Sequence, residues 1–223
     1  MKKCEQNVAD HKLYKDKSKD CGNWLAKAKD RFADNADATG SRQELEERLE
    51  RIQELINERD TGFAKLSQAL EAGERLYPNT ATDGRETVRQ ELRQHKLNWE
   101  SLFDDLSSAQ RKLEVALVQW TTFDDSYGQV EQWLRDAEVQ LEGQIPLRST
   151  LEEKKSQLQN FKVLHQDVLS YQRVIDSVDD KARTLFQNNS DTQLSNFVSQ
   201  TGARYSKLCS LAKVSVCLMN FGQ

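Results

Sequence analysis

Proline and glycine are both scarce in this sequence, with 2 prolines and 9 glycines among 223 residues. Because these residues interrupt helices and supply the turns of sheet proteins, their scarcity argues against a turn-rich β architecture. Hydrophobic residues are also few, at 37% against about 45–50% in an average globular protein, while 30% of residues are charged. The chain therefore cannot fill one deep spherical core, and a thin, all-α protein is the expected class.

An excess of positive charge is also missing. The net charge is −4 and the isoelectric point about 5.6, so no field attracts phosphate backbones or anionic lipid. No stretch approaches the roughly 20 uncharged apolar residues that span a bilayer, and the richest one, Leu208 to Phe221, contains Lys213. The polar N-terminus lacks the apolar segment of a secretory signal. We therefore expect no nucleic-acid partner, no direct membrane contact and a cytoplasmic location.

Residue patterns that carry catalysis or bind metals are lacking too. No serine lies in a Gly-x-Ser-x-Gly turn, and no glycine-rich loop is present to cradle a phosphate. Acidic pairs such as Asp104 and Asp105 point about 100° apart on a helix and cannot flank one substrate bond. The four cysteines match neither zinc-ligand nor redox-pair spacing and are interpreted as reduced thiols: Cys4, Cys21, Cys209 and Cys217. We expect no enzyme activity, no cofactor and no metal.

Three histidines are the strongest candidates for chemistry. His95 and His165 fall on inward-facing positions of their helices. We expect both to be core histidines that are hydrogen-bonded to their neighbours. His11 has Asp10 beside it but no second histidine or cysteine at ligand spacing. None of the three is assigned to a metal site.

Apolar residues recur in alternating steps of three and four along two long stretches. The first predicts one amphipathic helix from Ser41 to Tyr77. The second contains no proline and predicts a helix over 85–141, about 85 Å long at 1.5 Å per residue. The stepping positions are Leu45, Leu49, Ile52, Ile56, Arg59, Phe63, Leu66, Leu70, Gly73 and Tyr77, then Leu92, His95, Trp99, Leu102, Leu106, Ala109, Leu113, Ala116, Trp120, Phe123, Tyr127, Val130 and Leu134.

Four breaks separate the expected helices, and each break precedes a helix-start signal. In every case an oxygen acceptor stands three positions before an acidic or amide side chain, so the two can satisfy the free amides at a helix N-terminus. The breaks are Ala33 to Gly40, Pro78 to Gly84, Gly143 to Arg148 and Asn188 to Ser190. The pairs are Ser41 with Glu44, Asp83 with Glu86, Ser149 with Glu152 and Ser190 with Gln193.

The pattern of helix, break, helix, break, helix occurs twice. Trp24 in the first helix corresponds to Trp133 at a shift of 109 (133 − 24 = 109), and Trp99 in the third helix corresponds to Tyr205 at a shift of 106 (205 − 99 = 106). A unit of this size that folds back twice forms an antiparallel three-helix bundle. We therefore expect two tandem antiparallel three-helix bundles, joined by a continuous helix into an elongated rod.

The bundles are expected at residues 1–118 and 119–223. Their places in the stepping pattern predict that Trp24, Trp99, Trp133 and Tyr205 are structural core residues. Trp120 and Phe123 lie where the third helix of the first bundle becomes the first helix of the second, and are predicted to pack at the junction between the bundles, under the breaks at Ala33 to Gly40 and Asn188 to Ser190.

The chain resembles two consecutive spectrin repeats over nearly its whole length. The resemblance rests on Trp24-Leu25 and Trp133-Leu134 in the first helices, on Trp99 in a third helix, replaced by Tyr205 in the second unit, and on the unbroken run between the units. The segments at 119–123 and 164–168 look most like repeats from nesprins, giant proteins that tether nuclei to the cytoskeleton.

This resemblance implies a structural rod or spacer segment of a large cytoskeletal linker that connects the nuclear envelope to actin. It implies a cytoskeletal location, with the outer nuclear membrane reached through the parent chain. The implied partners are neighbouring repeats of the same chain and cytoskeletal or signalling proteins, and the isolated segment is expected to be a monomer. Apolar residues continue to Phe221, as expected if a following repeat has been cut away.

Two alternatives remain open. A docking module would bind a partner helix or a second copy along an exposed apolar stripe, for which the face from Cys209 to Phe221 is the first candidate. A long parallel coiled-coil dimer is the other, although the four capped breaks favour chains that fold back.

Overall fold

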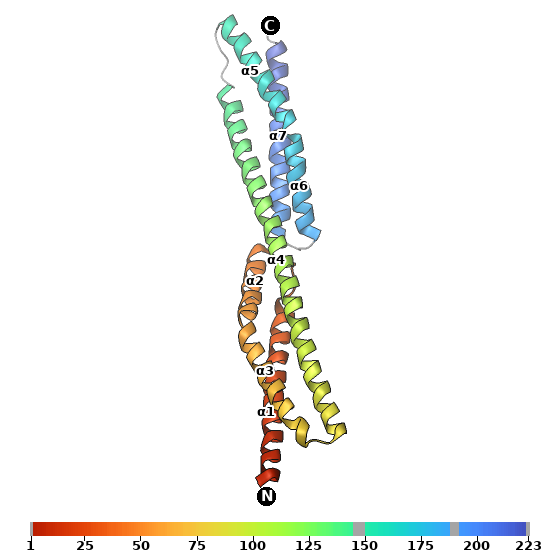
Figure 1. The fold of residues 1–223 in the computed structure, drawn as a ribbon. Coiled ribbons are helices and arrows are strands. Elements are labelled where there is room, and N and C mark those ends of the chain that lie inside the picture. The colour runs from red at the N-terminus through yellow and green to blue at the C-terminus, as the bar shows by residue number, and fades with distance from the viewer. Residues whose placement is uncertain (1, 145–149, 188–191, 222–223) are drawn as a thin grey trace. The chain divides into compact units, whose positions relative to one another are not determined.

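The computed structural model of the chain describes residues 2–144, 150–187 and 192–221, and in these ranges it contains helices and no strand. The predicted all-α class is therefore confirmed. The chain divides into two compact units, Met1–Leu117 and Val118–Gln223, which are described separately (Figure 1). Within the described ranges, no helix combines the length and apolar character that crossing a bilayer requires.

Unit 1 is an antiparallel bundle with three arms. The first arm is α1 (Lys2–Asn35), and the second consists of α2 (Arg42–Asn57) and α3 (Arg59–Leu76), followed by the short 3-10 helix η1 (Tyr77–Asn79). The third arm is the N-terminal part of α4 (Thr82–Gln144). In Figure 1, α1 runs beside α2 and α3, and α4 returns along the same bundle.

Unit 2 repeats this plan. Its first arm is the C-terminal part of α4, its second arm consists of α5 (Leu151–Ser170) and α6 (Gln172–Gln187), and its third arm is α7 (Thr192–Phe221). The two predicted three-helix bundles are thus confirmed. The predicted continuous helix is also confirmed, because α4 is one helix of 63 residues that supplies an arm to each unit.

Two of the helix starts show the expected capping chemistry. At α2, the Glu44 amide donates to the Ser41 hydroxyl (3.3 Å) and the Ser41 amide donates to the Glu44 carboxylate (2.7 Å), as predicted. At α5 the pair is Thr150 with Glu153, one residue later than predicted. Thr150 has an extended backbone (φ −95°, ψ 155°) that brings its hydroxyl within 3.3 Å of the Glu153 amide, whereas Ser149 lies outside the described residues.

The other two predicted starts are not found as expected. Helix α4 begins at Thr82, so Asp83 lies within its first turn instead of preceding it, and the prediction of Asp83 as a cap is wrong. A carboxylate in the first turn still interacts favourably with the positive end of the helix dipole.

The fourth predicted start, at Ser190, lies outside the described residues. Helices also extend into the predicted breaks, since α1 runs to Asn35 and α4 to Gln144.

The second arm of each unit is interrupted at a single residue. The prediction of one helix from Ser41 to Tyr77 is wrong, because Glu58 has ψ near 3° and separates α2 from α3. Tyr171, with ψ near −9°, separates α5 from α6 in the same way. A regular helix has ψ near about −42°. The apolar stepping continues across both residues, so periodicity alone does not reveal the interruptions.

Side chains from all three arms fill the interior of each unit. The stepping pattern of α4 is largely buried, as its spacing predicts, because residues three and four apart share one helix face. The largest fully buried side chains are Cys21, Leu45, Ile52, Leu55, Leu102, Leu106 and Leu113 in unit 1, and Val130, Leu134, Val168 and Leu208 in unit 2.

Candidate functional site

The four predicted core residues, Trp24, Trp99, Trp133 and Tyr205, take part in contacts between the arms of the two bundles. In unit 1, Trp99 on α4 contacts Phe63 of α3 and Phe103 of its own helix, with ring centroids 5.6 and 4.9 Å apart. The Arg59 guanidinium lies over the Trp99 ring at 5.4 Å, within the range of a cation–π interaction. Trp99 is half-buried, so it closes the side of the bundle beside α3 instead of filling its centre.

Trp24 of α1 packs against the second arm of unit 1 at a glycine, Gly62 of α3. The Gly62 backbone approaches the indole so closely that a Cβ added there would lie 2.2 Å from a Trp24 ring carbon. Trp24 is itself half-buried. The sequence analysis missed Gly62, although a glycine inside an amphipathic helix is a recognised sign of close packing.

Unit 2 has a different aromatic centre. Trp133 on α4 stacks on Tyr171, with centroids 3.8 Å apart and planes 6° from parallel, and contacts Tyr205 at 6.4 Å. Tyr205 is buried, and its hydroxyl donates a hydrogen bond to the Val168 carbonyl (2.8 Å). Burial raises the pKa of Tyr205, and the neighbouring Cys209 raises it further. Tyr205 therefore connects α7 to the turn of α5 that precedes the interruption.

A polar network joins α7 to α4 on another side of unit 2. Arg204 donates to Glu131 (2.7 Å) and to Glu138 (3.0 Å), and Thr201 donates to Glu131 (3.2 Å). Burial opposes ionisation of Glu131, but the hydrogen bonds from Arg204 and Thr201 outweigh it, so the pKa of Glu131 is lowered. The hydrogen bond to Glu138 is the largest cause of the raised pKa of Arg204. The sequence analysis did not single out these residues.

Unit 1 has its own polar contacts between α1 and α4. The Tyr14 hydroxyl donates to Glu91 (2.5 Å), and the Ser18 hydroxyl lies 3.0 Å from Nε2 of His95. Burial, and then the bond to Glu91, raise the pKa of Tyr14. Burial lowers the pKa of His95, although the nearby Glu91 carboxylate acts in the opposite direction. His95 thus lies on an inner, hydrogen-bonded position of its helix.

The two predicted junction residues are both buried. Trp120 has 7% and Phe123 has 3% of its surface exposed, and Phe123 stacks on Tyr127 at 5.8 Å. The Trp120 indole nitrogen is buried and has no hydrogen-bond partner among the described residues. The break at Asn188 to Ser190, which was predicted to cover them, lies outside the described residues.

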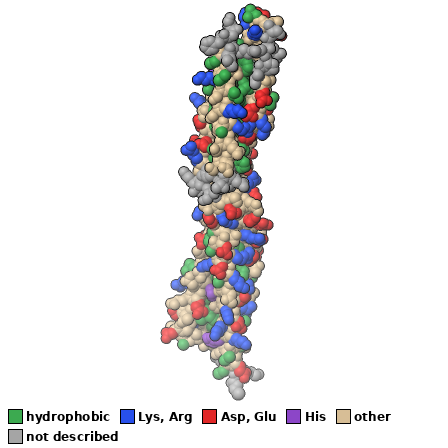
Figure 2. Space-filling view, turned by 180° about the vertical axis from the view of Figure 1, so that it is seen from behind, with side chains coloured by type: hydrophobic (Ala, Val, Ile, Leu, Met, Phe, Trp, Pro, Cys, Tyr) green, Lys and Arg blue, Asp and Glu red, His purple; other side chains and the backbone are tan. Residues whose placement is uncertain are grey.

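No arrangement for catalysis or metal binding occurs in the part of the chain that the structure describes. It contains no group of three or more His, Cys, Asp or Glu placed to hold a metal ion. His11 is exposed and His165 is half-buried. The four cysteines are free, with Cys21 buried, Cys209 half-buried and the other two exposed. On the visible face of each unit, acidic and basic side chains are interspersed (Figure 2).

Comparison with known proteins agrees with this architecture. The spectrin repeats of nesprin-1 match residues 36–171, more than half of the chain. The chain belongs to the nesprin-1 spectrin-repeat family. The matched range includes all of α2, α3, α4 and α5, and therefore parts of both bundles. The resemblance to nesprin repeats predicted from the sequence is confirmed.

Several large proteins contain regions similar to this pair of spectrin repeats. Muscle-specific protein 300 kDa from Drosophila melanogaster is 33% identical over 223 residues, which cover 93% of this chain and 2% of the relative. Mouse nesprin-3 is 23% identical over 168 residues, covering 75% of this chain and 17% of the relative. Human microtubule-actin cross-linking factor 1, isoforms 6/7, is 28% identical over 130 residues, covering 57% and 4%.

These spectrin-repeat relatives are cytoskeletal linker proteins of the nesprin and cross-linking-factor type. The chain spans at most 17% of the length of the relatives named here. What this chain shares with them is therefore the spectrin repeat.

Proposed function

We propose that this chain is a structural spacer in a large cytoskeletal linker, connecting the nuclear envelope to actin in the cytoplasm. The observation that carries the proposal is α4, one helix of 63 residues that serves as an arm of both bundles. At 1.5 Å per residue, such a helix is about 95 Å long. Force applied along the chain would pass through this helix, while each bundle could yield separately.

The relatives support the cytoskeletal part of the proposal. One of them is named as a cross-linker of microtubules and actin, and another is a nesprin. We propose neighbouring repeats of the same chain as the direct partners, with cytoskeletal or signalling proteins docking from outside. In this role Trp24, Trp99, Trp133 and Tyr205 serve as core residues, Trp120 and Phe123 serve at the junction, and no residue is needed for catalysis.

Solution scattering from the dilute chain, together with its sedimentation mass, tests the spacer function. A globular domain of 223 residues has a radius of gyration of about 17 Å. We expect a value well above this, with a maximum dimension of at least about 95 Å for the monomer. A compact monomer with a radius of gyration near that of a globular domain would refute the spacer function.

A docking function is the second candidate, and the surface of α7 favours it. Leu211 and Val214 are three positions apart on one helix face, and their side chains are 45% and 51% exposed. The side chains from Leu218 onward lie outside the described residues. Replacing both leucine and valine by serine (L211S/V214S) should leave the scattering profile of the monomer unchanged and abolish partner binding if this face docks a helix.

A further inference from the structure

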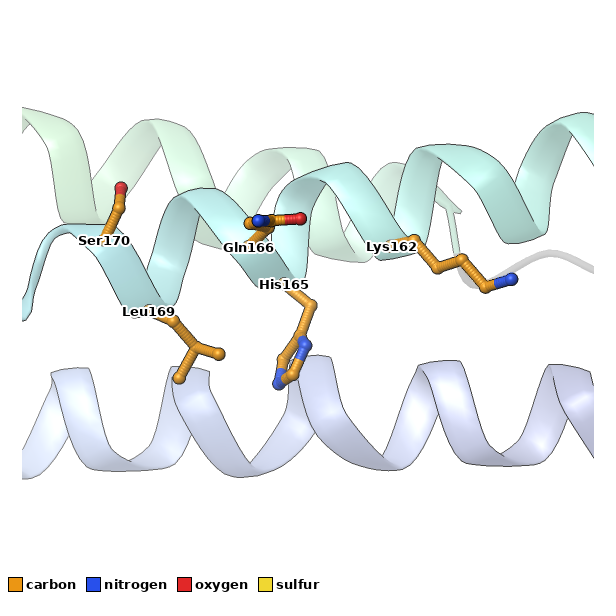
Figure 3. Close-up of a pocket in the computed structure, with 5 residues that line it drawn as sticks. All are labelled: Lys162, His165, Gln166, Leu169 and Ser170. Atoms are coloured by element: carbon orange, nitrogen blue, oxygen red, sulfur yellow. The ribbon is translucent and has the colours of Figure 1, made fainter.

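Each unit has a surface groove along the first half of its second arm. In unit 1 a groove of about 540 Å³ lies between α2 and α4, and in unit 2 a groove of about 590 Å³ lies along α5. Figure 3 shows His165 and Leu169 pointing from α5 toward α7. The unit 1 groove is lined by Glu46, Leu49, Glu50, Gln53, Glu54, Asn57, Gln110 and Glu114; the unit 2 groove is lined by Lys162, His165, Gln166, Leu169 and Ser170.

The two grooves occupy overlapping positions in the two bundles. The capping residues Ser41 and Thr150 fix the correspondence between α2 and α5 at a shift of 109 (150 − 41 = 109). With this shift, Gln53 corresponds to Lys162, and Asn57 corresponds to Gln166. Both members of each pair line their own groove. The same part of the bundle surface is therefore hollowed in both units.

The charge of the groove differs between the units. The lining of the unit 1 groove includes four glutamates and no lysine or arginine. Glu46 pairs with Arg42 and Glu54 with Arg51, but Glu50 and Glu114 form no ion pair with a described residue. The lining described for the unit 2 groove includes Lys162 and no acidic residue.

The difference extends about two turns from Lys162 toward the N-terminus of α5, as far as Lys155. Lys155 of α5 corresponds to Glu46 of α2 at the same shift (155 − 109 = 46). Lys155 and Lys162 belong to a stripe that steps by four and three along α5, in which Leu151 and Leu169 are also exposed. Leu158 steps between the two lysines but is buried in the bundle, so the surface part of the stripe, the α5 seam, consists of Leu151, Lys155, Lys162, His165 and Leu169.

We propose that the chain associates with a second copy of itself through these surfaces, the glutamate-lined groove of unit 1 in one copy receiving the α5 seam of unit 2 in the other. Opposite charges on the two surfaces attract, whereas two copies of the same groove repel each other. Leu49 in the groove and the exposed Leu151 and Leu169 of the α5 seam supply apolar contact. The sequence predicted a monomer and left association with a second copy open as an alternative. The grooves favour that alternative and predict pairing that increases with concentration. This pairing does not depend on the spacer function.

Sedimentation equilibrium of the full chain across a concentration series tests the proposal. We expect the apparent mass to rise toward that of a dimer in low salt, and less so in high salt, because ions screen exposed charges. Two charge-reversed variants, E50K/E114K and K155E/K162E, should each weaken association at least tenfold. The first has positive charges in both surfaces and the second has negative charges in both, so an equal mixture of the two should associate again.

Matched controls reverse equally many exposed charges elsewhere. E71K/E142K is the control for the acidic groove, and K207E/K213E is the control for the α5 seam; all four side chains are exposed. Circular dichroism should show that every variant is folded, since only exposed side chains change. We expect both controls to associate like the original chain.

Three results would overturn the proposal. One is a monomer at all concentrations in low salt, and another is an equal loss of association in the variants and their controls. The third is a mixture of the two charge-reversed variants that stays monomeric. Association that is lost in L211S/V214S but kept in the charge variants would assign the contact to α7 instead. The scattering test of the spacer function uses the dilute monomer, so its outcome is independent of all these results.

Discussion

At the scale of single residues, the two bundles hold corresponding tryptophans in different ways. Trp24 lies against the bare backbone of Gly62, whereas Trp133 stacks on the ring of Tyr171. The first contact depends on the absence of a side chain and the second on the presence of an aromatic one. The two aromatic centres should therefore respond to different substitutions.

Gly62→Ala should destabilise unit 1. In an open helical position, alanine is favoured over glycine by about 1 kcal/mol. At Gly62 the new methyl group would overlap the Trp24 ring, and overpacking of this kind costs about 1–3 kcal/mol. We expect a net loss in the free energy of unfolding, measured by urea denaturation.

Gly128→Ala is the matched control for this substitution. Gly128 is also helical, but apart from the neighbouring backbone of its own helix no atom lies within 4 Å of the position that its Cβ would take. This variant should gain about 0.5–1 kcal/mol. A Gly62→Ala protein that is stabilised as much as Gly128→Ala would show that Trp24 does not require the glycine.

Tyr205→Phe should weaken unit 2 by about 0.5–1.5 kcal/mol, the usual net contribution of one hydrogen bond. The substitution removes the hydroxyl that donates to the Val168 carbonyl and keeps the buried ring. Tyr171→Phe is the control, because it keeps the ring stacked on Trp133. Thermal unfolding of the two variants should differ, and equal melting temperatures would contradict the role assigned to the Tyr205 hydroxyl.

His95 should make the stability of unit 1 depend on pH. Burial lowers its pKa in the folded state below the ordinary 6.5, with Glu91 partly opposing and Ser18 and Tyr14 nearby on α1. The unfolded chain therefore takes up a proton first as the pH falls, and the free energy of unfolding should decrease below about pH 6.5. Urea unfolding at pH 7.5 and pH 5.5 measures this change.

The variant His95→Gln should show a smaller loss of stability between these two pH values. Exposed His11→Gln is the control and should behave like the original chain. An unchanged pH dependence in His95→Gln would assign the effect to other groups.

At the scale of elements, the single-residue interruptions divide both second arms. Helix α3 starts after Glu58 without a side-chain cap, so the amides of its first turn lack partners within the helix. Arg31 pairs with Glu58 at 2.7 Å, but both side chains are well exposed and the pair adds little stability. The interruption should therefore be a local point of opening.

Amide hydrogen exchange tests this expectation. The amides of Arg59, Asp60 and Thr61 should exchange faster than those of Gln53 to Asn57, whose helix precedes the interruption. Equal protection across residues 53–61 would mean that the second arm opens as one helix despite the change in ψ at Glu58.

The predictions from the sequence succeed where a pattern repeats over many turns, as along α4. They fail where one residue decides the outcome. A signal for the first interruption was present, since Arg59 is a charged residue at a stepping position where an apolar one is expected. In the structure its side chain is exposed and lies over Trp99 instead of entering the core. No such signal precedes Tyr171.

The sequence also could not predict which side chains on different helices contact each other. Arg204 could be placed on a helix surface, but its bonds to Glu131 and Glu138 depend on how α7 lies against α4. The contact between Trp24 and Gly62 likewise depends on the register of two arms that are distant in the sequence. Periodicity gives the face of each helix and leaves the register of its neighbours undetermined.

At the scale of the whole molecule, α4 is the only helix in the described ranges that supplies an arm to both units. Val118→Pro should separate the unfolding of the two bundles. Proline within a helix costs about 3 kcal/mol, and the exposed Val118 side chain contributes little packing. We expect calorimetry to resolve two transitions. Val118→Ala is the control, and two variants with the same single transition would contradict a coupling through the helix.

The length of α4 also fixes an angular phase between its two buried stripes. Each residue advances a helix by about 100°, so one residue inserted near 118 would rotate every downstream core position by that angle. Seven inserted residues would restore the phase to within about 20°. A single inserted residue in this helix should therefore change the phase between the two stripes about five times as much as seven inserted residues do.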